Sequence, residues 1–270
     1  MLKRTFTGAG ITVAVYLILY FSYIPGVLSC AVALLTAFSV YEIYGAAGMS
    51  RHPVGLPCAM LAMMAVVLVP FPHYGRVLLL VFPAAVAAFL WMMYKQDSFR
   101  LDRPGKVSLV ALAVAFLFKA MPELRQIDGG LIYLTASVTL CFVTDVAAYL
   151  VGSRFGRHKL VPKVSPNKTV EGAVAGVAAS VLGMLVLGVF LSGWDGYRVS
   201  YPLLAVYGFL ASVVAQFGDL SMSVVKRVCG IKDFGKLLPG HGGMLDRFDS
   251  HLFCVAFTLL FCTLTGGFLR

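Results

Sequence analysis

Long apolar stretches separated by short polar segments run through the whole chain. Nine such stretches can be distinguished, and each is close to or above the roughly 17 residues that a helix needs to cross a bilayer. They cover residues 8–24, 26–46, 55–71, 75–94, 105–122, 130–151, 170–191, 201–220 and 250–268. Apolar and polar residues do not alternate within them, which argues against a transmembrane β-barrel. The pattern therefore predicts an all-α fold, a polytopic integral membrane helix bundle with about nine transmembrane helices.

The composition supports a membrane protein and argues against a nucleic-acid partner. Hydrophobic residues make up 60% of the 270 residues and charged residues only 13%, whereas a soluble domain carries about 25% charged residues. The net charge of +10 comes from cations in short segments between apolar stretches, where they orient a membrane protein and attract anionic substrates. The six cysteines include no C-x-x-C pair, so we interpret them as buried apolar residues.

The distribution of Lys and Arg predicts how the chain crosses the membrane. If the N-terminus is cytoplasmic, 17 of the 22 Lys and Arg residues fall on the cytoplasmic side, in agreement with the cation excess of cytoplasmic loops. We therefore expect a multi-pass protein of the cytoplasmic (inner) membrane, with the N-terminus and the active-site loops in the cytoplasm. The first stretch is interpreted as an uncleaved span rather than a signal peptide, because eight more stretches follow it.

This topology divides the chain into two parts. Residues 1–125 form an N-terminal part with spans one to five. Residues 126–270 form a catalytic part with spans six to nine and the cytoplasmic loops 152–169 and 221–249. These two loops hold most of the polar residues of the second half, so both are expected to contribute to one site on the cytoplasmic face.

The segment from Asp219 to Asp249 is unusually polar for this chain. It contains four acids, five cations, two serines, one histidine and five glycines. A segment with both signs of charge suits a polyphosphate and its metal ion. Contact with lipid headgroups is the alternative explanation for Lys226, Arg227 and Lys232, but it does not account for the acids between these cations.

The spacing of the acids suggests a metal site. Asp246 and Asp249 are three residues apart, so they share one face if the segment is helical. With Asp219 they would form an all-oxygen site suited to magnesium. Asp249 and Ser250 could instead cap the ninth span, which leaves Asp219 and Asp246 as the stronger ligand candidates. Asp145, near the end of the sixth stretch, is either functional, as acids at membrane depth usually are, or a buried partner of an arginine.

The turn from Pro239 to Gly243 is a candidate for binding phosphate. Gly242 and Gly243 allow backbone N–H groups to approach a ligand closely. His241 could act as an acid, donate a hydrogen bond to phosphate or serve only as a turn residue. Glycine-rich turns between helices are common, so this pattern alone is a weak indication.

The loop before the seventh span offers a second phosphate site. Ser165 and Lys168 could bind a phosphate group at the N-terminus of the following helix. Thr169 could cap that helix, with Glu171 in its first turn. The two roles involve different side chains and are compatible.

These polar segments resemble the conserved blocks of a known family. The C-terminal segment resembles the signature of the phosphatidate cytidylyltransferases, also called CDP-diacylglycerol synthases, at Ser223, Val225, Lys226, Arg227, Lys232, Asp233, Gly235, Leu238, Pro239, His241, Gly242, Gly243, Met244, Asp246, Arg247, Phe248 and Asp249. The block from Ser165 to Gly172 resembles a second family block, and Asp145 with Tyr149 resembles a third. The first half of the chain resembles the family only in its apolar spans.

The resemblance implies a magnesium-dependent membrane nucleotidyltransferase of phospholipid biosynthesis that joins CTP to phosphatidic acid and releases pyrophosphate. It implies a metal centre at Asp219 and Asp246, with Asp249 as a third ligand, a second cation such as K⁺, and a homodimer surrounded by membrane lipids. The residues expected in catalysis are Asp219, Lys226, Arg227, Asp246 and Arg247. Those expected to bind substrate are Ser165, Lys168, Ser223, Lys232, Asp233, His241, Gly242, Gly243 and Asp145.

Two other functions remain as alternatives. A CTP-dependent polyprenol or phytol kinase would transfer the γ-phosphoryl group to an alcohol and would release CDP instead of pyrophosphate. A transporter for an organic phosphate would place its ionisable residues near the middle of the membrane. In this sequence the ionisable residues gather at one predicted face, which argues against the transporter.

Overall fold

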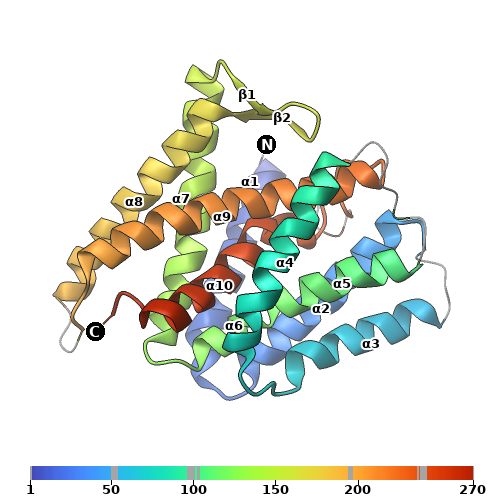
Figure 1. The fold of residues 1–270 in the computed structure, drawn as a ribbon, viewed down its shortest axis with the longest axis horizontal. Coiled ribbons are helices and arrows are strands. Elements are labelled where there is room, and N and C mark those ends of the chain that lie inside the picture. The colour runs from blue at the N-terminus through green and yellow to red at the C-terminus, as the bar shows by residue number, and fades with distance from the viewer. Residues whose placement is uncertain are drawn as a thin grey trace.

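The computed structural model describes residues 2–49, 54–95, 101, 104–193, 197–235, 237 and 242–269 of the chain. Helices account for most of these residues, and a short β-hairpin stands at one end of the bundle (Figure 1). The elements are α1 (Leu2–Tyr20), a 3-10 turn (Phe21–Tyr23), α2 (Val27–Ala46), α3 (Gly55–Leu68), α4 (Tyr74–Tyr94), α5 (Pro104–Phe118), α6 (Ala120–Arg125), α7 (Gly130–Phe155), β1 (Lys159–Val161), β2 (Ser165–Thr169), α8 (Val170–Ser192), α9 (Tyr201–Val228) and α10 (Leu245–Thr265).

The predicted fold class, an all-α polytopic membrane bundle, is confirmed. Each of the nine apolar stretches coincides with one helix or, for residues 105–122, with the consecutive helices α5 and α6. Seven helical segments of the described chain are long and apolar enough to cross a membrane. The segments Thr12–Tyr23 and Gly55–Leu68 are apolar but shorter, so the count of nine spans is approximate.

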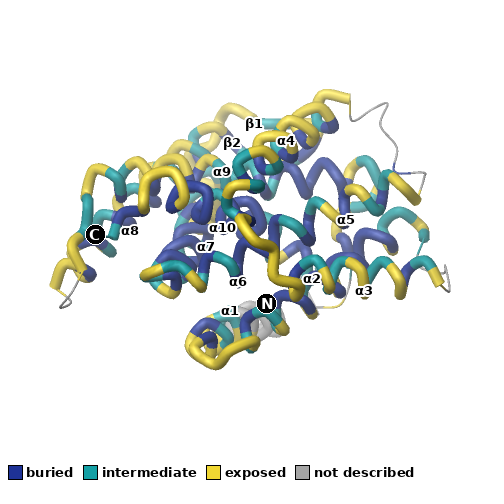
Figure 2. Tube along the Cα trace, turned by 60° about the horizontal axis from the view of Figure 1, so that its bottom comes forward, coloured by how far each residue is buried: buried dark blue, intermediate teal, exposed yellow. Residues whose placement is uncertain are grey.

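Helix α10 lies at the centre of the molecule. It packs against α9, α7, α4, α5 and α6 (Figure 1), and about two thirds of its residues are buried (Figure 2). Its side chains at Leu252, Phe253 and Val255 have no exposed surface. A helix surrounded by protein on all sides cannot shift without repacking its neighbours, so residues in its first turns are held in place by the whole bundle.

Helices α7, α8 and α9 pack closely through small residues and hydroxyl groups. A Cβ atom at Gly176 would lie 3.0 Å from the Thr144 carbonyl oxygen, so a larger residue could not occupy this position without separating α7 from α8. The hydroxyls of Thr144 and Ser180 are 2.6 Å apart, and that of Thr144 is 3.1 Å from Ser212 on α9. Small residues and hydroxyl pairs of this kind drive helix association in membranes, where burial of apolar surface contributes little.

The structure corrects the predicted ends of three spans. Helix α9 continues to Val228, two turns beyond the predicted end at residue 220, and α10 begins at Leu245 instead of residue 250. Much of the predicted loop 221–249 is therefore helical. The loop 152–169 likewise begins inside α7 and then forms the β1–β2 hairpin. Hydropathy marks the part of a helix that tolerates lipid, whereas these polar turns stay helical because they pack against protein.

Candidate functional site

A polar pocket opens beside the β-hairpin, where α7, α8 and α9 meet. Its volume is about 560 Å³, and α7 contributes Asp145, β2 contributes Lys168, and α9 contributes Gln216 and Asp219 to its wall. Asp145, Lys168 and Asp219 were all predicted as site residues from the sequence, although 74 positions separate the first from the last. The pocket is large enough for a phosphorylated ligand and carries charges of both signs.

An ion pair between Lys168 and Asp219 crosses this pocket. The Lys168 ammonium contacts the Asp219 carboxylate directly, and the two side chains are 27% and 25% exposed. Lys168 is placed here by the hairpin, in which Lys159 pairs with Thr169. Thr169 then caps α8, because its hydroxyl accepts a hydrogen bond from the Gly172 amide at 3.2 Å. This cap was predicted, and it fixes Lys168 one residue before the cap residue of the helix.

Two further acids adjoin the pair. Asp145 interacts electrostatically with Asp219 and Lys168, and Asp249 interacts with Asp219 and Asp145. The exposed Arg247 side chain also interacts with Asp145. Asp249 lies in the second turn of α10, so the alternative in which it caps this helix is wrong. The structure thus brings three carboxylates and two cations from four elements to one place.

Asp246 lies in a second cluster at the start of α10. Its Oδ1 atom accepts a hydrogen bond from Lys226 at 2.8 Å, and its Oδ2 atom accepts from the Phe234 and Gly243 amides at 2.9 Å each. Lys226 also lies over the Phe234 ring, with 5.5 Å from the ammonium to the ring centroid. The Lys226 and Asp246 side chains are only 10% and 3% exposed. A buried pair whose carboxylate accepts three hydrogen bonds fixes the local geometry, because either partner alone would be a costly buried charge.

The predicted metal ligands fall into both clusters. Asp219 and Asp249 interact electrostatically, whereas both oxygens of Asp246 already accept hydrogen bonds. Among the described residues, no group of three or more His, Cys, Asp or Glu side chains is arranged to hold a metal ion. The carboxylate oxygens have the chemistry that magnesium takes, and magnesium is commonly held by one or two carboxylates together with substrate phosphates. Asp219 and Asp249 fit that description, and a metal on Asp246 would have to displace Lys226.

The other predicted residues surround the two clusters. Ser223 is buried in α9, and the Arg227 side chain donates to the Val164 carbonyl at 3.0 Å, which ties the end of α9 to the hairpin. Ser165 is half-buried, and Lys232 and Asp233 are exposed. The backbone at Gly242 has a positive φ of 83°, which favours glycine as expected. His241 lies outside the described residues.

Two polar residues that were not predicted from the sequence lie at these clusters. Gln216 lines the polar pocket and donates to the Ala173 carbonyl at 3.2 Å. Glu42 comes from the N-terminal part and accepts hydrogen bonds from the Met244 and Leu245 amides. The signal for Glu42 was its position as a lone acid inside an apolar stretch, a feature that usually marks a function or a buried partner.

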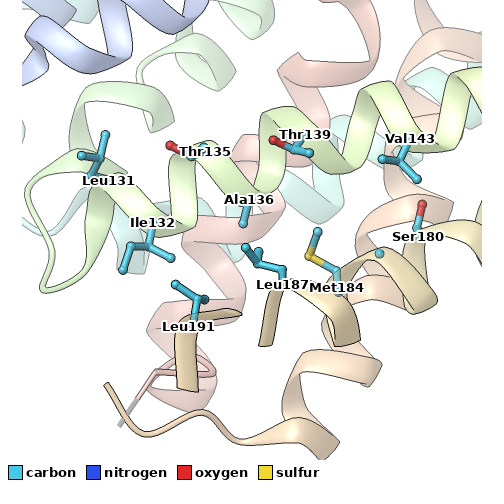
Figure 3. A pocket seen from close by; sticks show the side chains of 11 residues that line it. Leu131, Ile132, Thr135, Ala136, Thr139, Val143, Ser180, Met184, Leu187 and Leu191 are labelled. Atoms are coloured by element: carbon cyan, nitrogen blue, oxygen red, sulfur yellow. The ribbon is translucent and has the colours of Figure 1, made fainter. Parts of the chain in front are cut away.

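A second pocket between α7 and α8 differs in character. Its volume is about 320 Å³, and apolar side chains such as Leu131, Leu187 and Leu191 line most of it (Figure 3). The hydroxyls of Thr135, Thr139 and Ser180 are its only polar side-chain groups, and none of the predicted site residues lines it. The chemistry-bearing residues therefore gather at the hairpin end of the bundle and not in this apolar groove.

Comparison with known proteins gives a family match over nearly the whole chain. The sequence model described as the Cytidylyltransferase family matches residues 2–265. The match includes the N-terminal part, which resembles the family in sequence only through its apolar spans.

Individual relatives match over shorter segments. A Bacillus subtilis protein named phosphatidate cytidylyltransferase is 38% identical over 178 residues, which cover 64% of this chain and 65% of the relative. Proteins with the same name from Staphylococcus saprophyticus and Staphylococcus haemolyticus are 39% identical over 147 residues and 41% identical over 126 residues. These two matches cover 54% and 47% of this chain and 53% and 47% of the relatives. The chain thus spans about half to two thirds of the length of these relatives.

Proposed function

The chain belongs to the cytidylyltransferase family, and we propose that it joins CTP to phosphatidic acid to give CDP-diacylglycerol and pyrophosphate. The observation that carries this proposal is the polar pocket, in which Asp145, Lys168 and Asp219 meet beside the hairpin of an otherwise apolar bundle. A pocket at that position can receive a water-soluble nucleotide from one side and a lipid headgroup from the membrane. The names of the relatives support the same substrates.

The reaction requires two anions to approach each other. A phosphate oxygen of phosphatidic acid attacks the α-phosphorus of CTP, and a new P–O bond forms. The bond from the α-phosphorus to the oxygen that bridges to the β-phosphorus breaks, and pyrophosphate leaves with the electron pair. No general base is needed, because the attacking phosphate is already ionised near neutral pH. Catalysis therefore consists of holding both phosphates in line and neutralising charge.

The charged residues of the two clusters suit these tasks. Lys168 and Arg247 lie beside the carboxylates of the polar pocket, where they would hold a lipid phosphate together with Ser165. Lys226 and Arg227, at the end of α9, would hold the phosphates of CTP with Ser223 and the backbone N–H group of Gly242. Lys232 and Asp233 are exposed at the rim, where they would contact the nucleotide.

Magnesium dependence is part of the proposal. Asp219 and Asp249 would hold the ion, and Asp246 would join them if Lys226 moved to a phosphate. When bound, the ion would neutralise charge that develops on the leaving pyrophosphate. A second cation such as K⁺ is proposed on the same carboxylates.

The surroundings of the enzyme are proposed in the same way. We place it as a homodimer in the cytoplasmic membrane with the hairpin facing the cytoplasm, where CTP is available. The exposed apolar side chains of α8, such as Val186, Val189 and Phe190, would then contact lipid or the second subunit.

The kinase and transporter alternatives find less support. The hydroxyl acceptor of a kinase would need a base, whereas the Asp219 carboxylate is already paired with Lys168. Asp145 lies a little past the middle of α7 and Asp219 in the second half of α9, whereas the two lysines that line the pocket, Lys159 and Lys168, belong to the hairpin beyond the ends of α7 and α8. A transporter site would be expected nearer the middle of the bundle.

A product assay tests the proposed function. Purified protein in detergent with phosphatidic acid, magnesium and CTP labelled at the α- and γ-phosphates should release pyrophosphate and form a labelled lipid. CTP without phosphatidic acid is the control and should give neither product. Release of CDP in place of pyrophosphate would favour the kinase, and the absence of both products would overturn the proposed activity.

A further inference from the structure

Glu42 is an acid in an unusual place. It lies in α2, inside the second apolar stretch, and it is only 4% exposed. Burial of a carboxylate away from water is costly unless hydrogen bonds compensate. Its contacts should therefore explain why an acid occupies this position in the N-terminal part.

The carboxylate of Glu42, a residue of α2, caps the N-terminus of the central helix α10. Its two oxygens accept hydrogen bonds from the Met244 amide at 2.7 Å and the Leu245 amide at 2.9 Å. These amides stand at the start of α10, and the residue at the cap position, Met244, provides no side-chain hydrogen bond of its own. The first amides of a helix have no partner within the helix and favour negative charge. A residue some 200 positions earlier in the chain thus supplies the cap.

The loop before α10 is shaped to accept this carboxylate. A Cβ atom at Gly243 would lie 2.5 Å from both Glu42 oxygens, and one at Gly235 would lie 2.8 Å from Oε1. Neither position could carry a side chain while Glu42 remains in place. Two separate parts of the loop therefore converge on one side chain of α2.

Glu42 and Asp246 hold the same backbone from two sides. The Gly243 amide donates to Asp246, whereas the next two amides donate to Glu42. Asp246 in turn binds Lys226 and the Phe234 amide. The alignment of Lys226 at the end of α9 thus depends on a backbone that Glu42 fixes.

We propose that Glu42 is a positioning residue for the cluster around Lys226 and Asp246, the part of the site that would bind CTP. It holds the first turn of α10 so that the Lys226–Asp246 pair keeps its place. This inference rests on the proposed function for its kinetic consequences, but the geometric part stands without it. It also gives the N-terminal part a share in the chemistry, beyond that of a membrane anchor.

The test compares three variants. Glu42→Gln keeps the shape of the side chain but presents an amide N–H₂ group to one of the two backbone donors. Gly243→Ala disturbs the same contact from the loop side, because its Cβ would meet the carboxylate. Ser39→Ala is the matched control, since Ser39 is also buried in α2, one turn away, and bonds only within its own helix at Leu35 in the described contacts.

Two measurements decide the result. The first is the KM for CTP and for phosphatidic acid together with kcat, and the second is amide hydrogen exchange. Glu42→Gln and Gly243→Ala should lower kcat/KM for CTP by about 10- to 100-fold, the scale that a small misplacement of reacting groups produces. The KM for phosphatidic acid should stay within about two-fold, because the Lys168–Asp219 pocket is untouched. Exchange should accelerate at residues 242–246 but not at the hairpin, 159–169, and Ser39→Ala should match the wild type.

Several outcomes would overturn the inference. Wild-type kinetics and exchange in Glu42→Gln would do so, as would equal losses for both substrates with faster exchange throughout the bundle. If Glu42→Gln does not fold, Gly243→Ala decides by the same two measurements. If the wild type itself makes no CDP-diacylglycerol, the proposed function fails, and the local exchange pattern alone still supports or refutes the positioning role.

Discussion

The ion pair between Lys168 and Asp219 shows how a charged contact can matter for function more than for stability. Both side chains are about a quarter exposed, and exposed pairs of this kind contribute no more than about 1 kcal/mol to folding. The same two groups line the polar pocket beside Asp145. Their charges are thus available to a ligand, which can exchange partners with them at little cost.

Replacing Asp219 with Asn should therefore separate activity from stability. We expect pyrophosphate release to fall by about 100-fold or more, the usual effect of losing a preorganised charge at a reacting centre. The melting temperature in detergent should change by only about 2–4 °C. Asp128→Asn, at an exposed acid between α6 and α7, is the control and should retain both properties. Normal activity in Asp219→Asn would remove this residue from the site.

At the scale of single residues, the sequence singled out several side chains that the structure brings together, but it did not predict how they group. Asp145, Lys168 and Asp219 were predicted separately and lie in one pocket. Asp246 and Asp249 do share a helix, yet Asp246 belongs with Lys226, and Asp249 adjoins Asp219. Which carboxylate meets which cation depends on the packing of α9 against α10, and residue spacing within one segment carries no information about that packing.

Glycines set how closely the elements around the pocket approach one another. A Cβ atom at Gly172, in the first turn of α8, would lie 2.6 Å from the Ala148 carbonyl oxygen of α7 and 3.0 Å from the Thr169 hydroxyl. The first neighbour is backbone and cannot rotate away, so α8 would have to move from α7. Because both helices form the pocket wall, such a shift would reach Lys168 and Asp145.

Gly172→Ala should lower both stability and activity. Overpacking at a close helix contact costs about 1–3 kcal/mol, so the melting temperature should fall and kcat/KM for phosphatidic acid should fall with it. Gly45→Ala, near the end of α2, is the matched control because its Cβ would meet no atom within 4 Å. That change should be neutral or stabilising by up to about 1 kcal/mol, since Ala favours helix over Gly. Equal melting temperatures for the two variants would refute the packing argument.

The ends of the elements were the least predictable part of the fold. Helix α9 runs through Ser221, Ser223 and Lys226, all of which are buried. Their low hydropathy predicts a loop, because hydropathy measures how well a residue tolerates lipid. These side chains are instead buried against other parts of the protein. The cap at Thr169 was predicted because its signal is local, but the cap that Glu42 provides for α10 was not, because it crosses the whole chain.

For the whole molecule, the apolar pattern predicted the order of the helices but not which of them lies inside. In the 18-residue apolar segment of α10, 72% of the residues are buried. In the corresponding segment of α8, only 28% are buried. Both appear as apolar stretches in the sequence, because lipid and protein interior favour similar side chains. The central place of α10 explains why the signature residues of its first turns can be fixed so firmly.

The orientation of the bundle gives a prediction for the molecule as a whole. The hairpin with Lys163 and the segment with Arg198 lie at opposite ends of the helices (Figure 1), and both side chains are exposed. The cation excess predicts that the hairpin faces the cytoplasm. In a variant with its six native cysteines replaced by alanine, Arg198→Cys should react with a membrane-impermeant maleimide in intact cells. Lys163→Cys should react only after permeabilisation.

The reverse labelling pattern would put the polar pocket outside the cell, away from CTP. The proposed reaction could not then draw on cytoplasmic nucleotide, even if the purified protein performed it in detergent. The proposal therefore requires both the right membrane orientation and the right activity. The two cysteine variants test the orientation, which an assay of purified enzyme cannot reveal. Because Lys168 follows Lys163 in the same hairpin, the label also reports the side from which substrates reach the Lys168–Asp219 pair.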